Sequence, residues 1–154
     1  MIEASVETDV QKIVVEEVFP HAPDVLWRAL TTGDLIGRWL MAPSGFEAVE
    51  GREFTFQTTP AGSWDGVIEC RVLEVVAGKR FAFAWRGGHE ANLGYGSRLD
   101  TVVTLTLEPA PGGTRLRLVH AGFELPRNAF AFKNMSEGWP TVMGRLEAVA
   151  AELP

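Results

Sequence analysis

Between Phe46 and His120 the apolar residues alternate with polar ones, and this period of two constrains the fold more than any other feature of the chain. Side chains alternate between the two faces of a β-strand, so the pattern predicts strands with one buried face. Glycine, proline and aspartate divide the region into five strand segments: REFTFQT (52–58), DGVIECRVLEVV (65–76), RFAFAW (80–85), SRLDTVVTLTLEP (97–109) and TRLRLVH (114–120). Most connections are too short for parallel crossovers, so we expect an antiparallel meander.

The segment before this region predicts a strand followed by two short helices. Residues 10–19 are rich in β-branched residues and end at Pro20, which is typical of a strand. Helical spacing over 24–31 predicts a short helix. Asp34 is expected to cap a second short helix over 35–40.

The C-terminal segment carries one apolar stripe at helical spacing over about five turns. Its members are Met135, Trp139, Val142, Met143, Leu146, Val149, Ala150 and Leu153. The spacing continues across Gly138 and Pro140, so we expect a helix that already runs upstream of Pro140 and is kinked there. The sheet, this long helix and the two short helices must bury their apolar faces against one another, which predicts an α+β fold.

Composition favours one domain spanning residues 1–154 and disfavours several kinds of partner. The net charge of −6 argues against nucleic acid, because binding phosphates requires clustered lysine and arginine. The N-terminal segment resembles neither a signal peptide nor a membrane span, so we expect a cytoplasmic protein without membrane insertion. Cys70 is the single cysteine, which excludes an internal disulfide and favours a small buried side chain.

Several segments in order resemble one known family. They are FPHAPDVLWRALTTGDLIGRW (19–39), EGREFTF (50–56), VLEVVAGKRFAFAW (72–85), GGTRLRLVHAGF (112–123), and Gly138 and Trp139 followed by Leu146. Together they resemble the START-like or SRPBCC superfamily, in the subgroup related to the activator of the heat-shock chaperone ATPase. The resemblance implies a helix-grip fold, in which a curved antiparallel sheet of about seven strands wraps around the C-terminal helix and leaves a cavity between them. It does not imply one activity, because one fold hosts many functions.

The sequence contains no recognisable catalytic, cofactor or metal motif. A G-x-S-x-G elbow and a P-loop are both absent. His21, His89 and His120 lie in three distant segments without metal-ligand spacing. We therefore expect no cofactor and no metal, and an enzymatic activity has no positive support from the residues.

His120 shares a strand face with Leu116 and Leu118, so it is expected to point toward the helix and the cavity. Two interpretations stay open: a ligand-contacting or basic histidine, and a core histidine satisfied by hydrogen bonds. Inward-facing aromatic and thioether side chains have the same double interpretation, as pocket lining or as core. The predicted ligand-binding set is Trp39, Met41, Phe54, Phe56, Cys70, Phe83, Trp85, His120, Met135, Trp139 and Met143. Two glycine-rich connections, 58–66 and 86–97, are expected to control access.

These observations predict a protein that binds a small hydrophobic ligand, aromatic or lipid-like, between the sheet and the long helix. A cavity well below roughly 300 Å³ would argue against it. One alternative, which rests on the resemblance, is a co-chaperone module of the stress response that contacts a chaperone ATPase. Another is a polyketide cyclase or hydrolase with His120 as base. Homodimerisation is left open by the sequence.

Overall fold

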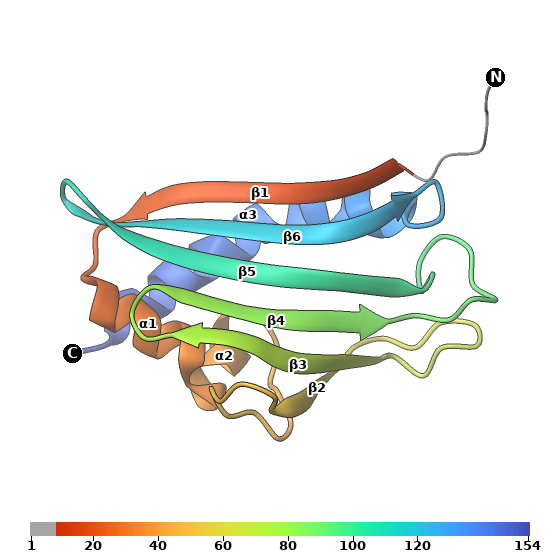
Figure 1. Ribbon diagram of the computed structural model, residues 1–154, viewed down its shortest axis with the longest axis horizontal. Coiled ribbons are helices and arrows are strands. Elements are labelled where there is room, and N and C mark those ends of the chain that lie inside the picture. The colour runs from red at the N-terminus through yellow and green to blue at the C-terminus, as the bar shows by residue number, and fades with distance from the viewer. Residues whose placement is uncertain (1–8) are drawn as a thin grey trace.

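One antiparallel sheet and three helices make up residues 9–154, the part of the chain that the computed structural model describes (Figure 1). The elements in chain order are β1 (Asp9–Phe19), α1 (Pro23–Thr31), α2 (Gly33–Trp39), β2 (Glu53–Gln57), β3 (Val67–Val76), β4 (Arg80–Gly87), β5 (Leu99–Ala110), β6 (Gly113–Leu125) and α3 (Ala129–Glu152). The order of strands across the sheet is β1-β6-β5-β4-β3-β2. The predicted α+β helix-grip architecture is confirmed.

The sheet has six strands in the described residues, where the family resemblance implied about seven. No further strand forms between α2 and β2, where Pro43, Gly45 and Gly51 interrupt the chain. This segment contributes only an isolated bridge, between Ser44 and Thr55. Proline and positive-φ glycines do not sustain a strand, so no ladder develops there.

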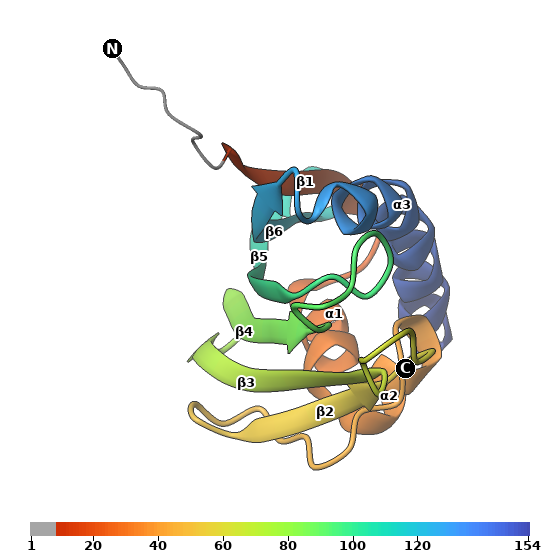
Figure 2. The same ribbon diagram turned by 90° about the vertical axis from the view of Figure 1, so that its right-hand side faces the viewer.

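The sheet curves into an open trough, and α3 lies along its open side (Figure 2). The inward residues of successive strands stand directly opposite one another: Phe54 pairs with Cys70, and Cys70 pairs with Trp85. This register confirms the alternation predicted for the strands, because Phe54, Phe56, Phe81, Phe83 and Trp85 are all buried.

Helix α3 buries one stripe against the trough, as its spacing predicts. Trp139, Met143, Leu146, Val149 and Ala150 are its buried residues. The helix is continuous from Ala129 to Glu152, with Pro140 in its interior, so the prediction that it runs upstream of the proline is confirmed. The kink at Pro140 stays a prediction.

The two short helices close one end of the trough. Leu26, Ala29 and Leu30 of α1 are fully buried, and the indole N–H of Trp39 in α2 donates to the carbonyl of Ala29 at 2.9 Å. This bond ties α2 to α1. The predicted cap at Asp34 is wrong: the N-cap of α2 is Thr32, and Asp34 lies in the first turn.

A tight turn at Pro111–Gly112 joins β5 to β6. Gly112 has a φ of 83°, a backbone conformation that glycine adopts at low cost. At the next position a Cβ on Gly113 would collide with the carbonyl of Phe19. Glycine there lets β6 begin directly beside the end of β1.

Candidate functional site

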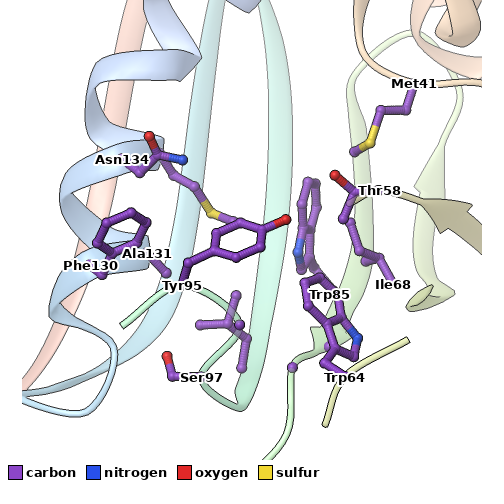
Figure 3. A pocket seen from close by; sticks show the side chains of 15 residues that line it. Met41, Thr58, Trp64, Ile68, Trp85, Tyr95, Ser97, Phe130, Ala131 and Asn134 are labelled. Carbon is purple, nitrogen blue, oxygen red and sulfur yellow. The ribbon is translucent and has the colours of Figure 1, made fainter. Parts of the chain in front are cut away.

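A cavity of about 200 Å³ lies at the end of the trough that faces the two long loops (Figure 3). Its walls come from the first turns of α3, the inner face of β3, β4 and β5, the segment after α2, and the loops after β2 and β4. The side chains and backbone that line it belong to Met41, Thr58, Trp64, Ile68, Trp85, Gly87, Gly88, Tyr95, Gly96, Ser97, Leu99, Phe130, Ala131, Asn134 and Met135. The lining is mainly apolar, and Thr58, Ser97 and Asn134 add hydroxyl and amide groups to it.

Two loops hold each other over this cavity. The hydroxyl of Tyr95 donates to the carbonyl of Thr59 at 2.8 Å. The Asn92 side chain makes two further bonds: its amide nitrogen donates to Ala61 O at 2.6 Å, and its oxygen accepts from Ser63 N at 3.2 Å. These bonds join 58–66 to the loop that follows β4, so the two segments predicted to control access form one wall.

Aromatic rings continue from this wall onto α3. The ring centroids of Trp64 and Tyr95 are 6.0 Å apart, and those of Tyr95 and Phe130 are 6.1 Å apart. Tyr95 and Phe130 keep 39% and 49% of their surface exposed, values that place them at the cavity mouth rather than in the core. Figure 3 shows Tyr95 reaching from its loop toward Trp85.

The predicted ligand-binding residues fall into three groups. Met41, Trp85 and Met135 line the cavity. Trp139 lies beside it, in an adjoining depression of about 130 Å³ that shares Trp85 and Met135. The remaining members are buried in the core away from the cavity: Trp39, Phe54, Phe56, Cys70, Phe83, His120 and Met143.

His120 is fully buried behind the cavity, and both of its ring nitrogens have partners. An indole N–H can only donate, so the 3.0 Å bond from Trp139 Nε1 makes Nδ1 of His120 the acceptor. The neutral ring then carries its proton on Nε2 and donates to Thr101 Oγ1 at 2.8 Å. Thr101 Oγ1 in turn donates to the carbonyl of Trp85, also at 2.8 Å.

This directed chain of hydrogen bonds matches a neutral imidazole and leaves no place for a second ring proton. Burial lowers the pKa of His120 to about 3, in the same direction. A general base needs a ring nitrogen within reach of its substrate, whereas both nitrogens here are committed inside the core.

Cys70 lies on the inner face of β3, between Phe54 on β2 and Trp85 on β4. Burial raises the pKa of its thiol to about 12, so the thiolate is disfavoured at neutral pH. The ring of Phe54, which stands opposite Cys70, packs against those of Phe56 and Phe83 with centroid distances of 5.6 and 5.7 Å. They form a packed aromatic core that supports the cavity wall from behind.

Sequence reasoning missed Trp64, Tyr95 and Phe130, which complete the mouth of the cavity. Trp64 and Tyr95 belong to the glycine-rich loops, and large aromatics inside such loops were the available signal. Phe130 lies off the apolar stripe of α3, so periodicity could not select it.

Two negative findings apply to residues 9–154. No three histidine, cysteine or acidic side chains gather there in a way that could hold a metal ion. Within the same range, none of the helices has the length and apolar character needed to cross a membrane.

A curved antiparallel sheet that grips a long helix, with a small cavity at one end, defines the class as a START-like helix-grip protein. More particularly, the chain belongs to the family described as Activator of Hsp90 ATPase homolog 1-like protein, whose family model matches residues 20–151. The subgroup suggested by the sequence segments is therefore confirmed.

Individual relatives agree with this placement. The chain is 27% identical over 133 residues to the mouse (Mus musculus) activator of 90 kDa heat shock protein ATPase homolog 1; the match covers 83% of this chain and 33% of the relative. This chain thus spans about a third of the mouse protein's length. A crystal structure of a Mesorhizobium loti protein has a TM-score of 0.80 and 35% identity, covering 94% of this chain and 99% of that one.

A more distant structure shares the fold alone. The solution structure of the Aha1 dimer from Colwellia psychrerythraea has a TM-score of 0.67 at 21% identity, covering 89% of this chain and 93% of that one.

Proposed function

We propose that this protein binds a small apolar molecule of one or two rings. The ligand lies in the cavity between α3 and the two hydrogen-bonded loops, 58–66 and the loop after β4. The observation that carries the proposal is the cavity's lining, in which Trp64, Trp85, Tyr95 and Phe130 surround a space of about 200 Å³. Ligand sites are typically apolar and aromatic with a few polar groups that fix orientation. Thr58, Ser97 and Asn134 supply such groups at this site.

The volume limits the size of the ligand. It is below the roughly 300 Å³ at which ordinary ligand pockets begin, which counts against a full lipid or a drug-sized molecule. An apolar cavity of about 150 Å³ is nevertheless enough to bind benzene. A compact aromatic ligand, somewhat larger than benzene, therefore fits the site better than the lipid-like alternative.

Blocking the cavity is expected to abolish binding of such molecules. Ala131 lies on α3 at the cavity wall, and replacing it with phenylalanine would fill the space without removing a polar group. Ala148 lies on the exposed side of the same helix, so Ala148→Phe is a matched control. Calorimetric titration of indole, naphthol and decanoic acid should show binding of the aromatic probes to the wild type and the control. Affinity should fall by about tenfold or more in Ala131→Phe, since the added ring takes up the ligand's volume.

Two results would overturn the proposal. The first is that none of the three probes binds the wild type at millimolar concentration. The second is that Ala131→Phe, shown to be folded by circular dichroism, binds them as tightly as the wild type. Tighter binding of decanoic acid than of the aromatic probes would contradict the size argument.

A second candidate function, a co-chaperone that stimulates a chaperone ATPase in the cytoplasm, is favoured by the family match. If it holds, the chain should raise the ATP hydrolysis rate of a purified Hsp90-type chaperone and should be retained with it in a pulldown. An unchanged rate together with no retention would reject this function. The Ala131→Phe variant separates the two proposals, because a co-chaperone surface outside the cavity would keep its effect when the cavity is filled.

A further inference from the structure

The two edge strands of the sheet, β2 and β1, differ in length and in how their outer backbone groups are bonded. At one edge, β2 has five residues, and its backbone is covered by Ser44, whose N–H and C=O bond to Thr55 at 2.8 and 3.1 Å. At the other edge, β1 has eleven residues and, within residues 9–154, pairs with β6 alone. In Figure 1 no other labelled helix or strand lies above β1, while Figure 2 shows α3 beside β1 on the open side of the sheet, where the two elements pack together.

A long edge strand that pairs with a neighbour on one side only presents a row of backbone groups that can pair with another strand. Proteins usually protect such edges with charged side chains, lysine above all, with proline, with bulges or with a cover. Of these devices, β1 has charged side chains at Lys12, Glu16 and Glu17. Proline is absent between Asp9 and Phe19. The register shift in the β1–β6 pairing places the extra residue, Gly122, on β6, so β1 itself continues regularly.

The outward face of β1 carries an apolar and charged pattern that is unusual for a solvated edge. Val10, Val14 and Val18 are 61%, 44% and 48% exposed, with Lys12 and Glu16 between them. In an antiparallel pair, residues that stand opposite one another share a face. The pattern Val-Lys-Val-Glu-Val along this face therefore shows which side chains would meet if two copies of β1 paired antiparallel in each register.

Antiparallel pairing of two β1 strands centred on Val14 is complementary at every outward position. Val14 then lies opposite its own copy, Val10 opposite Val18, and Lys12 opposite Glu16. Moving the centre by one residue in either direction places Lys12 and Glu16 opposite valines. Moving it by two places Lys12 opposite Lys12 or Glu16 opposite Glu16. Only the Val14-centred register combines valine pairs with two oppositely charged pairs.

From this self-complementarity we infer that the partner of the β1 edge is a second copy of this chain. The two copies are related by a twofold axis that passes through the Val14 pair, perpendicular to the sheet, and their sheets join into one continuous sheet. The interface is isologous, because each contact from Lys12 to Glu16 occurs twice. Strand pairing alone buries less than a standard interface of about 1,600 Å², so we expect a dissociation constant in the micromolar range. The inference does not depend on the ligand or on the co-chaperone proposal.

Exchanging the charges at positions 12 and 16 tests whether the partner of β1 is a second copy of this chain and whether the two strands pair in the Val14-centred register. Lys12→Glu and Glu16→Lys each convert both charged pairs of a homodimer into like-charged pairs, whereas an equimolar mixture of the two variants restores opposite charges in both pairs. Sedimentation velocity of the full chain should be run at about 0.15 M salt, where the Debye length of about 8 Å screens the net charge of the two copies. The wild type should dimerise, and each single variant should lose about tenfold or more in affinity. The mixture should recover a dimer close to the wild type.

A matched control for Lys12→Glu is Arg145→Glu, which makes the same change of charge on the exposed side of α3 and should leave the dimer intact. Circular dichroism of each variant verifies the fold. A wild type that stays monomeric up to about millimolar concentration, far above the range expected for such an interface, would overturn the inference. Single variants that dimerise as well as the wild type, or a mixture that stays monomeric, would also overturn it.

Discussion

Acidification is expected to destabilise this protein through His120 before most of its carboxyl groups are protonated. The free histidine pKa of 6.5 falls to about 3 in the folded chain because the imidazole is buried. In the window between these two values the unfolded chain binds a proton at this position and the folded chain does not. Lowering the pH therefore favours the unfolded state, by up to about tenfold in the unfolding equilibrium constant per pH unit.

The sign follows from the direction of the pKa shift. A depressed pKa stabilises the folded state fully above pH 6.5, and that contribution is lost as the pH falls toward 3. Protonation would also place a hydrogen on Nδ1, where the Trp139 N–H now donates. The ring would lose this bond, so the charged form has no matching arrangement in the core.

Urea unfolding at several pH values between about 7 and 4, which spans the upper part of the window, can isolate this contribution. His120→Gln removes the titrating group while its amide can still donate to Thr101 and accept from Trp139. The variant should show a distinctly weaker loss of stability on acidification than the wild type. His89→Gln makes the same change at an exposed loop position and should keep the wild-type slope. Equal slopes for His120→Gln and the wild type would refute the assignment.

Removing the indole N–H of Trp139 is expected to lower the free energy of unfolding by about 2–3 kcal/mol. The Trp139→Phe substitution keeps an aromatic ring but leaves Nδ1 of His120 without its donor at a buried position. An unsatisfied buried acceptor costs about 1–3 kcal/mol, and the smaller ring adds a packing loss. The ring also packs against Trp85, with centroids 6.1 Å apart, so the wall behind the cavity should loosen as well.

Trp27→Phe is the control for this substitution, because Trp27 is half-buried on α1 and takes no part in the His120 network. Its effect should be less than half that of Trp139→Phe. Chemical denaturation with unchanged m-values measures both differences. If the two variants lose the same stability, the bond from Trp139 to His120 contributes nothing specific.

The architecture was largely predictable because it depends on periodicity. Alternation over 52–120 identified every strand from β2 to β6, and the stripe that includes Trp139, Met143 and Leu146 identified α3. These patterns are local consequences of burying one face, so they can be detected without tertiary information. The cap at Asp34 was wrong because several residues near a helix start can serve as the cap, and backbone geometry selects among them.

The cavity was predictable only in part, for a geometric reason. Alternation shows that Phe54, Phe83 and Trp85 point inward, but an inward side chain can fill the core or border a space. Packing decides between the two: β4 places Trp85 beside the loops, whereas Phe54 and Phe83 lie where rings already fill the trough. Tyr95 joins the site through a bond to Thr59, 36 residues away along the chain, and no local pattern encodes that contact.

The sequence by itself determined the elements, their order, the inward faces and the family, because each of these follows from side-chain period or from motifs that lie close together in the chain. The sequence also contains the pattern of valine and charged residues in β1 that is complementary to a second copy of itself when the pairing is centred on Val14. Only the tertiary structure decided that β1, within residues 9–154, is an edge strand paired with β6 alone, that His120 is enclosed by Trp139 and Thr101, and that the two loops meet over a cavity. These features depend on which segments the curved sheet brings together, and distant contacts of this kind leave no periodic signal in the chain.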